Sequence, residues 1–206
     1  MNITLRHETP ADVGAIATLT AAAFLHAEHS SHTEQFIVNA LRAAGALTLS
    51  LVAERNGTPI GHASVSPIAL SNGAAGWYGL APVSVLPACQ GQGIGGPGVS
   101  PGGGARGGPG APRGGPGRAR GAGRPAGPGR GPARRRPPRL LAELQERGAA
   151  GCVVLGDPNY YGRFGFQAQS TLTLPGVPQN YFRAVAFQGA LPCAEVTFHN
   201  AFNAEA

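Results

Sequence analysis

The spacing of hydrophobic and polar positions divides the start of the chain into one strand and two helices. Residues 3–6 alternate as a short strand. Thr9-Pro10-Ala11-Asp12 supplies an N-cap, a proline at the first helical position and an acid three residues after the cap. Apolar positions then recur at helical spacing over 13–24. After the polar stretch 26–32, Ser31 and Glu34 form another capping-box pair, and apolar positions up to Ala44 predict a second amphipathic helix that Gly45 ends.

Strand spacing takes over after the second helix. Residues 47–53 alternate, Asn56-Gly57 is a strong signal for a two-residue hairpin turn, and residues 60–68 form the returning strand. Ser71-Asn72-Gly73 marks another turn before a strand over 77–86, which leads into a glycine-rich run. The order so far is a strand, two helices and three antiparallel strands.

A segment of 43 residues, 97–139, interrupts this pattern, and only Val99 and Ser100 in it are not Gly, Pro, Arg or Ala. With no aromatic residue, it cannot bury enough apolar surface to offset the entropy cost of ordering, so we predict that it is disordered. A GC-rich gene read out of frame would give the same composition, because the codons of these four residues begin with two G or C bases. An evolved linker and an out-of-frame segment are therefore both open origins.

Regular structure resumes after the segment. The predicted elements are a helix over 140–147, a buried strand over 151–155, a short helix over 157–161 capped by Asp157, a strand that opens at 164–166, a loop or short helix within 175–192, and a last strand over 195–199.

The charged residues are also distributed differently between the segment 97–139 and the rest of the chain. All 16 basic residues are arginine, and ten of them lie in 97–139, which holds no acid. The other six arginines face ten carboxylates, so the rest of the chain is mildly acidic despite a formal net charge of +6. The net charge alone therefore does not indicate a nucleic-acid-binding domain.

Cysteine usage and hydropathy indicate the cellular setting. Cys89, Cys152 and Cys193 are widely spaced and form no CxxC pair, which argues against a disulfide scaffold or a zinc site. No run approaches the ~20 apolar residues of a spanning helix, and the N-terminus has no signal-peptide pattern. We expect one domain over 1–200, interrupted by 97–139, with no membrane partner and a cytoplasmic location.

The run Gln90-Gly91-Gln92-Gly93-Ile94-Gly95 is the most informative motif. Glycines at these positions let backbone N–H groups point inward and bind an anion such as a phosphate. A dinucleotide-binding fingerprint would need a βαβ unit and a later acid, and a Walker loop would need a lysine, which this chain lacks. With these two nucleotide-binding motifs excluded, the remaining feature is a strand that runs directly into the glycine-rich loop.

This motif resembles the Gln/Arg-x-x-Gly-x-Gly/Ala acetyl-CoA motif of the GNAT acetyltransferase superfamily, which also follows the fourth strand. Residues 148–157 and the stretch Tyr160–Phe166 resemble further family elements, the latter its Tyr-x-x-x-Gly-Phe pattern. The resemblance covers residues 1–96 and 138–200. It implies an α+β fold with three α/β/α layers, in which a mixed, mostly antiparallel sheet splays between its fourth and fifth strands.

The same resemblance implies the chemistry. The chain would transfer an acetyl group from acetyl-CoA to a primary amine on a small molecule or peptide, by direct attack in a ternary complex and without a metal. Backbone groups of Val83, Ser84 and Val85 would bind the pantetheine arm. The residues that would hold the pyrophosphate are Gln90, Gly91, Gln92, Gly93, Ile94, Gly95 and Gly96.

Two proton transfers accompany this reaction, because the amine must lose a proton and the leaving thiolate gains one readily if it is offered. Tyr161 matches the family tyrosine near the CoA sulfur and is predicted to be the general acid. The alternative is an aromatic core residue beside Phe164 and Phe166. Tyr160 is interpreted as packing, and Cys89 and Cys152 as small apolar residues rather than nucleophiles.

The polar loop between the two helices borders the acceptor site in the family. Glu28, His29 and Glu34 are therefore predicted to contact the acceptor or relay protons. His26, His29 and His32 recur every three residues, which leaves a metal site as the alternative. His62 is interpreted as a half-buried histidine that nothing in the sequence ties to chemistry.

Two rival functions start from the segment 97–139. Arg106-Gly-Gly and Arg113-Gly-Gly resemble RNA-binding tracts, but no aromatic residue is present for base stacking, so only non-specific nucleic-acid association is expected. A catalytically impaired acetyl-CoA-binding protein is the second rival. Pro97 and Gly98 stand where a helix should face the phosphates, and both are poor helix formers, so weaker acetyl-CoA binding is predicted.

Overall fold

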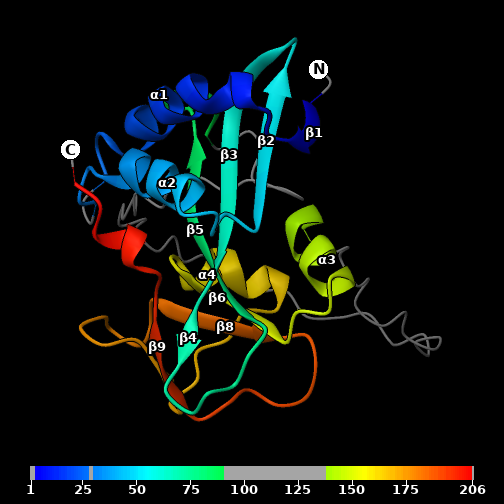
Figure 1. Ribbon diagram of the computed structural model, residues 1–206, viewed down its shortest axis with the longest axis vertical. Coiled ribbons are helices and arrows are strands. Elements are labelled where there is room, and N and C mark those ends of the chain that lie inside the picture. Colours follow the sequence, from blue (N-terminus) through cyan, green and yellow to red (C-terminus); the bar gives the residue numbers. More distant parts are fainter. Residues whose placement is uncertain (1–2, 28–29, 91–137, 206) are drawn as a thin grey trace, which may run out of the picture.

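The computed structural model of the protein describes residues 3–27, 30–90 and 138–205 (Figure 1). The helices are α1 (Val13–Phe24), α2 (Glu34–Ala43), α3 (Arg139–Glu146) and α4 (Pro158–Tyr161), with 3₁₀ turns η1 (Pro10–Asp12), η2 (Pro87–Cys89), η3 (Gly162–Phe164) and η4 (Asn200–Asn203). The strands are β1 (Ile3–His7), β2 (Leu49–Arg55), β3 (Thr58–Pro67), β4 (Ala69–Leu70), β5 (Trp77–Val85), β6 (Gly151–Leu155), β7 (Leu172–Thr173), β8 (Phe182–Ala186) and β9 (Ala194–Thr197).

Six strands form the central sheet, in the order β1-β2-β3-β5-β6-β8. Neighbouring strands are antiparallel except β5 and β6, which run parallel. β4, β9 and β7 form a second, three-stranded sheet. The predicted mixed, mostly antiparallel sheet is therefore confirmed.

Both faces of the central sheet are covered, which gives the predicted three layers. On one face, Leu144 of α3 and Tyr161 of α4 join Val154 of β6 in a buried cluster. On the other face, one buried residue from each of α1 and α2 packs on Val52 of β2. Val153 of β6 packs there against the three-stranded sheet. Figure 1 shows α1 and α2 crossing β2, β3 and β5, with β4 and β9 near the end of the sheet that holds β6 and β8.

Local signals fixed several elements as predicted. Asn56 and Gly57 have φ angles of 51° and 77°, so both residues of the β2–β3 turn are left-handed, as a two-residue hairpin of this type requires. The Asp157 side chain accepts a hydrogen bond from the Asn159 amide at 2.8 Å and caps α4. Each of these signals acts within four residues, which is why the sequence alone reveals them.

Two predictions near the C-terminus were wrong, and a third has different bounds in the structure. Residues 175–192 contain β8, which forms because β6 offers it a buried antiparallel partner. No strand opens at 164–166: Phe164 ends η3, Gly165 turns the chain at φ 89°, Phe166 is buried in the core, and only Gln167 pairs, in an isolated bridge with Ala184. The strand predicted at 195–199 is β9, but it belongs to the second sheet and ends before His199.

The boundary of the low-complexity segment also needs correction. Pro138 is the N-cap of α3 and Arg139 its first residue, so the last two residues of the segment predicted to be disordered belong to a helix and its cap. The Arg139 guanidinium anchors the helix by hydrogen bonds to Glu143 and to the main-chain oxygen of Leu5. Across the described residues, no helix has both the length and the apolar character to cross a membrane.

Candidate functional site

β5 and β6 separate part of the way along β5. Their parallel pairing joins Trp77–Leu80 to Gly151–Val154. β5 continues to Val85 with β3 as its partner, while β6 ends at Leu155. Between Leu80 and Val85, the edge of β5 that faces away from β3 therefore has no partner in β6. This is the splay that the sequence analysis predicted between the fourth and fifth major strands.

A β-bulge lies where the strands separate. Leu80 pairs with Val65 and Val83 with Ala63, so Ala81 and Pro82 together face Ser64. The Ser64 hydroxyl donates to the carbonyl oxygens of both, at 2.9 and 3.4 Å. Sequence reasoning missed this bulge, although a proline inside a paired strand is a signal for one.

The bulge sets which main-chain N–H and C=O groups of β5 point to the open edge. Leu86 donates its amide hydrogen to the Ile60 carbonyl, and hydrogen-bonded pairs alternate along antiparallel strands. The main-chain groups of Val83 and Val85 therefore point to the open edge, whereas those of Ser84 point to β3. Gln90 reaches the same edge, because its side-chain amide donates to the Val85 carbonyl at 3.1 Å.

Side chains alternate about the same edge. Val83 and Val85 belong to the buried cluster under α3 and α4. Ser84 points to the opposite face, where its hydroxyl bonds Thr20 of α1 at 3.2 Å. Gly79, before the bulge, also faces this side, because a Cβ there would lie 2.4 Å from the Phe198 ring. The open edge thus has an α3/α4 side and an α1 side.

Several predicted site residues lie outside the described residues. They are Glu28, His29, the whole loop from Gly91 to Gly96, and the Arg-Gly tracts at Arg106 and Arg113.

Tyr161 lies on the α3/α4 side of the open edge, in the cluster that holds Val83 and Val85. Its ring packs edge-on against Tyr160 and Phe166, with centroids 5.1 and 5.7 Å away, and it lies against the backbone of Gly156. Burial raises the pKa of Tyr161 well above its usual range, and Tyr160 and Cys152 nearby add to the shift. The hydroxyl therefore stays protonated and is a hydrogen-bond donor at every physiological pH.

The neighbouring tyrosine is in a different setting. Tyr160 is half-buried, and the Arg163 guanidinium lies over its ring, 4.3 Å from the centroid. Burial raises the pKa of Tyr160 to about 12. Cys152 is completely buried, which raises the pKa of its thiol and keeps it protonated, so it is not an activated nucleophile.

Glu34 is buried at the start of α2 and holds the loop before it. Its Oε1 accepts hydrogen bonds from the Ser30 hydroxyl at 2.7 Å and the Ser31 amide at 3.2 Å. The second oxygen, Oε2, is buried without a hydrogen-bond partner among the described residues. His26 and His32 on the same loop are exposed. In the described ranges, no three His, Cys, Asp or Glu side chains converge to hold a metal ion.

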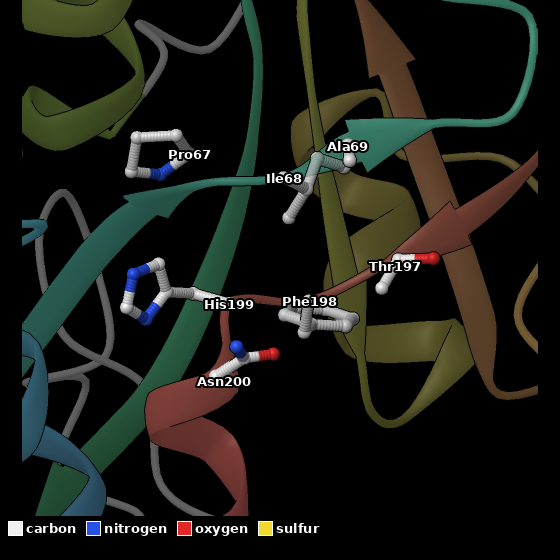
Figure 2. A pocket seen from close by; sticks show the side chains of 7 residues that line it. All are labelled: Pro67, Ile68, Ala69, Thr197, Phe198, His199 and Asn200. Atoms are coloured by element: carbon white, nitrogen blue, oxygen red, sulfur yellow. The ribbon is translucent and has the colours of Figure 1, made fainter.

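A pocket of about 390 Å³ opens on the α1 side of the sheet, lined by residues 67–69 and 197–200. Figure 2 shows Phe198 beneath Ile68, and His199 on the side of Pro67. Phe198 and Ile68 are the side chains that a Cβ on Gly79 would touch, so the pocket adjoins β5 just before the bulge. No local pattern could predict this pocket, because it joins segments about 130 residues apart.

His62 is wholly buried, with 0% of its surface exposed, and not half-buried as predicted. It lies on β3 opposite Ser84. Its burial among other polar side chains is a second feature that the sequence analysis missed, although the run of serines and histidine in β3 was a signal for it.

The comparisons with known proteins agree with this geometry. Residues 14–96 match the sequence profile of the Acetyltransferase (GNAT) family. The Escherichia coli N-acetyltransferase YhbS is 30% identical over 164 residues, which span 79% of this chain and 72% of YhbS.

Two solved structures are similar over at least 98% of this chain. A GNAT family acetyltransferase from Brucella melitensis, in complex with acetyl-CoA, is 39% identical, with a TM-score of 0.69 over 98% of both chains. The structure of YhbS in complex with CoA has 26% identity and a TM-score of 0.68, over 100% of this chain and 94% of YhbS. The splayed strands, the motif at Gln90 and these relatives together show that the chain belongs to the GNAT acetyltransferase family.

Proposed function

We propose that this protein transfers the acetyl group of acetyl-CoA to a primary amine on a small molecule or peptide, by direct attack in a ternary complex. The observation that carries the proposal is the open edge of β5, which is reached from two sides. Tyr161 lies on the α3/α4 side, and the pocket beside Gly79 opens on the α1 side.

The open edge fits an extended, amide-containing ligand. The main-chain groups of Val83 and Val85 point outward as those of a strand edge do, and a pantetheine arm carries amides that pair with such an edge. The Brucella relative was solved with acetyl-CoA and YhbS with CoA, which supports the same ligand here. Gln90 orders the end of β5 by binding the Val85 carbonyl, at the start of the predicted pyrophosphate loop.

The two sides of the edge separate the two reacting groups. Tyr161 would give a proton to the departing thiolate, and its burial, which keeps the hydroxyl protonated, supports this role. The pocket on the α1 side would admit the amine, because its wall of Ile68 and Phe198 touches β5 next to the bulge. Because the amine attacks from one side and the thiolate departs to the other, no acyl-enzyme is needed. Cys152 is also too deeply buried, and its thiol too weakly acidic, to form one.

An assay of thiol release from acetyl-CoA tests this function. The full-length protein is mixed with acetyl-CoA and a panel of small amines and short peptides, and CoA is measured with and without each amine. We expect release that depends on the amine and saturates with it. Absence of amine-dependent release, in a protein whose melting temperature rises with acetyl-CoA, would refute acetyl transfer to amines while leaving ligand binding intact.

The acceptor pocket has its own test. Gly79→Ala would push the Phe198 ring out of the pocket wall, because the new Cβ would lie 2.4 Å from it. We expect a higher KM for the amine and an unchanged KM for acetyl-CoA. Gly14→Ala is the matched control, since a Cβ at Gly14 meets nothing within 4 Å. An unchanged amine KM in Gly79→Ala would place the acceptor elsewhere.

A further inference from the structure

The pocket beside Gly79 has an apolar wall and a polar end. Ile68 and Phe198 form the wall, and Figure 2 shows Phe198 beneath Ile68. The Phe198 ring also packs on the ring of Phe202 in η4, with centroids 4.6 Å apart, which holds it in place. Beside this wall, Figure 2 shows His199 on the side of Pro67. An apolar group and a hydrogen-bonding group of one ligand can therefore bind next to each other.

The size of the pocket suits a small molecule. Pockets for small ligands span about 300–1,000 Å³, and a dry apolar cavity of about 150 Å³ is large enough for benzene. The volume of about 390 Å³ thus holds an aromatic ring or a branched aliphatic group, together with the atoms that join it to an amine. An aromatic ring placed there would meet the Phe198 ring, and such pairs are favourable beyond the area that they bury.

His199 offers one hydrogen-bond donor at the polar end. Its Nδ1 accepts a hydrogen bond from the Ala201 amide at 3.1 Å and so caps η4. A neutral imidazole has one donor nitrogen and one acceptor nitrogen, so the hydrogen lies on Nε2. Figure 2 shows this second nitrogen on the side of the ring that faces away from η4. No hydrogen bond joins Nε2 to a described residue, which leaves its N–H available to a ligand.

The lining of the pocket has no partner for a positive charge. None of the seven described residues that line it is an aspartate or a glutamate. Moving an ammonium group out of water is costly unless a carboxylate or several hydrogen-bond acceptors replace the water. A polyamine or a lysine side chain is therefore a poor ligand for the pocket, and an uncharged apolar group is a good one.

The order of these groups along β3 sets the direction of the acceptor. The bulge of β5 lies opposite Ser64, and Pro67 follows at the end of β3, next to the apolar wall. His199, on the side of Pro67, therefore lies between the wall and the bulge. The predicted pyrophosphate loop begins at Gln90, beyond Val85, so a pantetheine arm along the open edge would bring its thioester towards the bulge. An acceptor with its apolar group against the wall thus has its amine on the side of the thioester.

We propose that this pocket selects the acceptor, and that the acceptor is an amino-acid derivative with a free α-amine, a carbonyl group and an aromatic or branched apolar side chain. The side chain packs against Ile68 and Phe198, and His199 donates from Nε2 to the carbonyl oxygen. In such a molecule the carbonyl group is one carbon away from the amine, which matches the place of His199 between the wall and the bulge. This inference rests on the proposed acetyl transfer to an amine and makes His199 a specificity-determining residue.

Amino-acid amides that differ only in their side chain test the apolar wall. Phenylalaninamide, leucinamide, glycinamide and lysinamide share the α-amine and the carbonyl group. The full-length protein is given each amide with saturating acetyl-CoA, and the α-acetylated product is measured by chromatography. We expect kcat/KM for phenylalaninamide and leucinamide to be at least about tenfold above the values for glycinamide and lysinamide, because only the first two bury an apolar side chain.

A charge placed in the lining should shift this preference. Thr197 lines the pocket and is exposed, so Thr197→Glu adds a carboxylate without disturbing the core. We expect the ratio of kcat/KM for lysinamide to that for phenylalaninamide to rise by about twofold to fivefold, as for an exposed ion pair. Both rates come from one preparation, so any loss of folded protein lowers both and leaves the ratio unchanged.

The hydrogen bond from His199 is tested with an amine that lacks the carbonyl group. In His199→Asn the shorter side chain still caps η4 through its oxygen, but the N–H at the position of Nε2 is lost. We expect kcat/KM for phenylalaninamide to fall by about fivefold relative to wild type, and that for phenethylamine to change by less than about twofold. His7→Asn is the matched control, because His7 is an exposed histidine on the edge strand β1, and it should leave both values unchanged.

The results separate the role of the pocket from the proposed function. Equal kcat/KM values for the four amides, or an equal loss for phenylalaninamide and phenethylamine in His199→Asn, would overturn the role of the pocket in a protein that still acetylates amines. A wild-type protein that acetylates none of the five amines would overturn the proposed function, and this selectivity with it.

Discussion

The hydroxyl of Tyr161 can be tested by a substitution that changes almost nothing else. Tyr161→Phe keeps the buried ring and its contacts with Tyr160, Phe166 and Gly156. No hydrogen bond joins the Tyr161 hydroxyl to a described residue. We therefore expect the free energy of unfolding to change by less than about 1 kcal/mol.

The size of the kinetic effect follows from the environment of the hydroxyl. A general acid contributes about 10²- to 10⁴-fold, and most when its pKa is near that of the group it protonates. Burial moves the pKa of Tyr161 far above the roughly 8.5 typical of a thiol, so proton donation is uphill. We expect the low end of the range, a loss of about 100-fold in kcat, or about 3 kcal/mol in the activation free energy.

The assay is thiol release from acetyl-CoA at a saturating amine concentration, with acetyl-CoA affinity measured by calorimetry. We expect a loss of kcat with nearly unchanged affinity. The loss should be constant from about pH 6 to about pH 9, because Tyr161 does not titrate there. Tyr160→Phe is the matched control and should keep most activity, since that ring packs beside Phe164 and Arg163. Equal turnover in Tyr161→Phe and wild type would dismiss the general acid.

Three further outcomes are expected. Gly156→Ala places a Cβ 2.4 Å from the Tyr161 ring, so we expect lower turnover together with about 1–3 kcal/mol less stability in urea unfolding; unchanged values would mean that the ring is not held there. The pKa of Glu8 is lowered in the fold, so its contribution to stability is present above its ordinary pKa of 4.5 and is lost as pH falls below that value. Glu8→Gln should therefore flatten the acid side of the stability curve by about 1 kcal/mol, after allowance for solvent screening, and an identical pH dependence in the two proteins would contradict this. Calorimetry should find acetyl-CoA binding weaker than micromolar, because Pro97 and Gly98 follow the glycine loop; micromolar or tighter binding would refute that expectation.

Short-range patterns account for most of what could be predicted. The hairpin at Asn56-Gly57, the cap at Asp157 and the apolar stripes of α1, α2 and α3 depend on residues within a few positions of one another. β8 could not be predicted in the same way, because only its pairing with β6 makes it a strand. The same holds for β4 and β7, strands of two residues each that exist only beside β9.

The features of the candidate site also fall into those that short-range patterns predict and those that depend on tertiary packing. Residue types at fixed spacing were enough to predict the family resemblance, the strand that enters the loop at Gln90, and Tyr161 as the tyrosine to test. The tertiary structure alone decided that Val83 and Val85, but not Ser84, direct main-chain groups to the open edge, because a bulge against Ser64 sets that alternation. It also brought Glu8, Arg42, Ser50 and His62 into one hydrogen-bonded chain. Glu8 directly follows β1, and the other three residues lie on α2, β2 and β3, so no local pattern joins them. Only the packing of these elements brings them together.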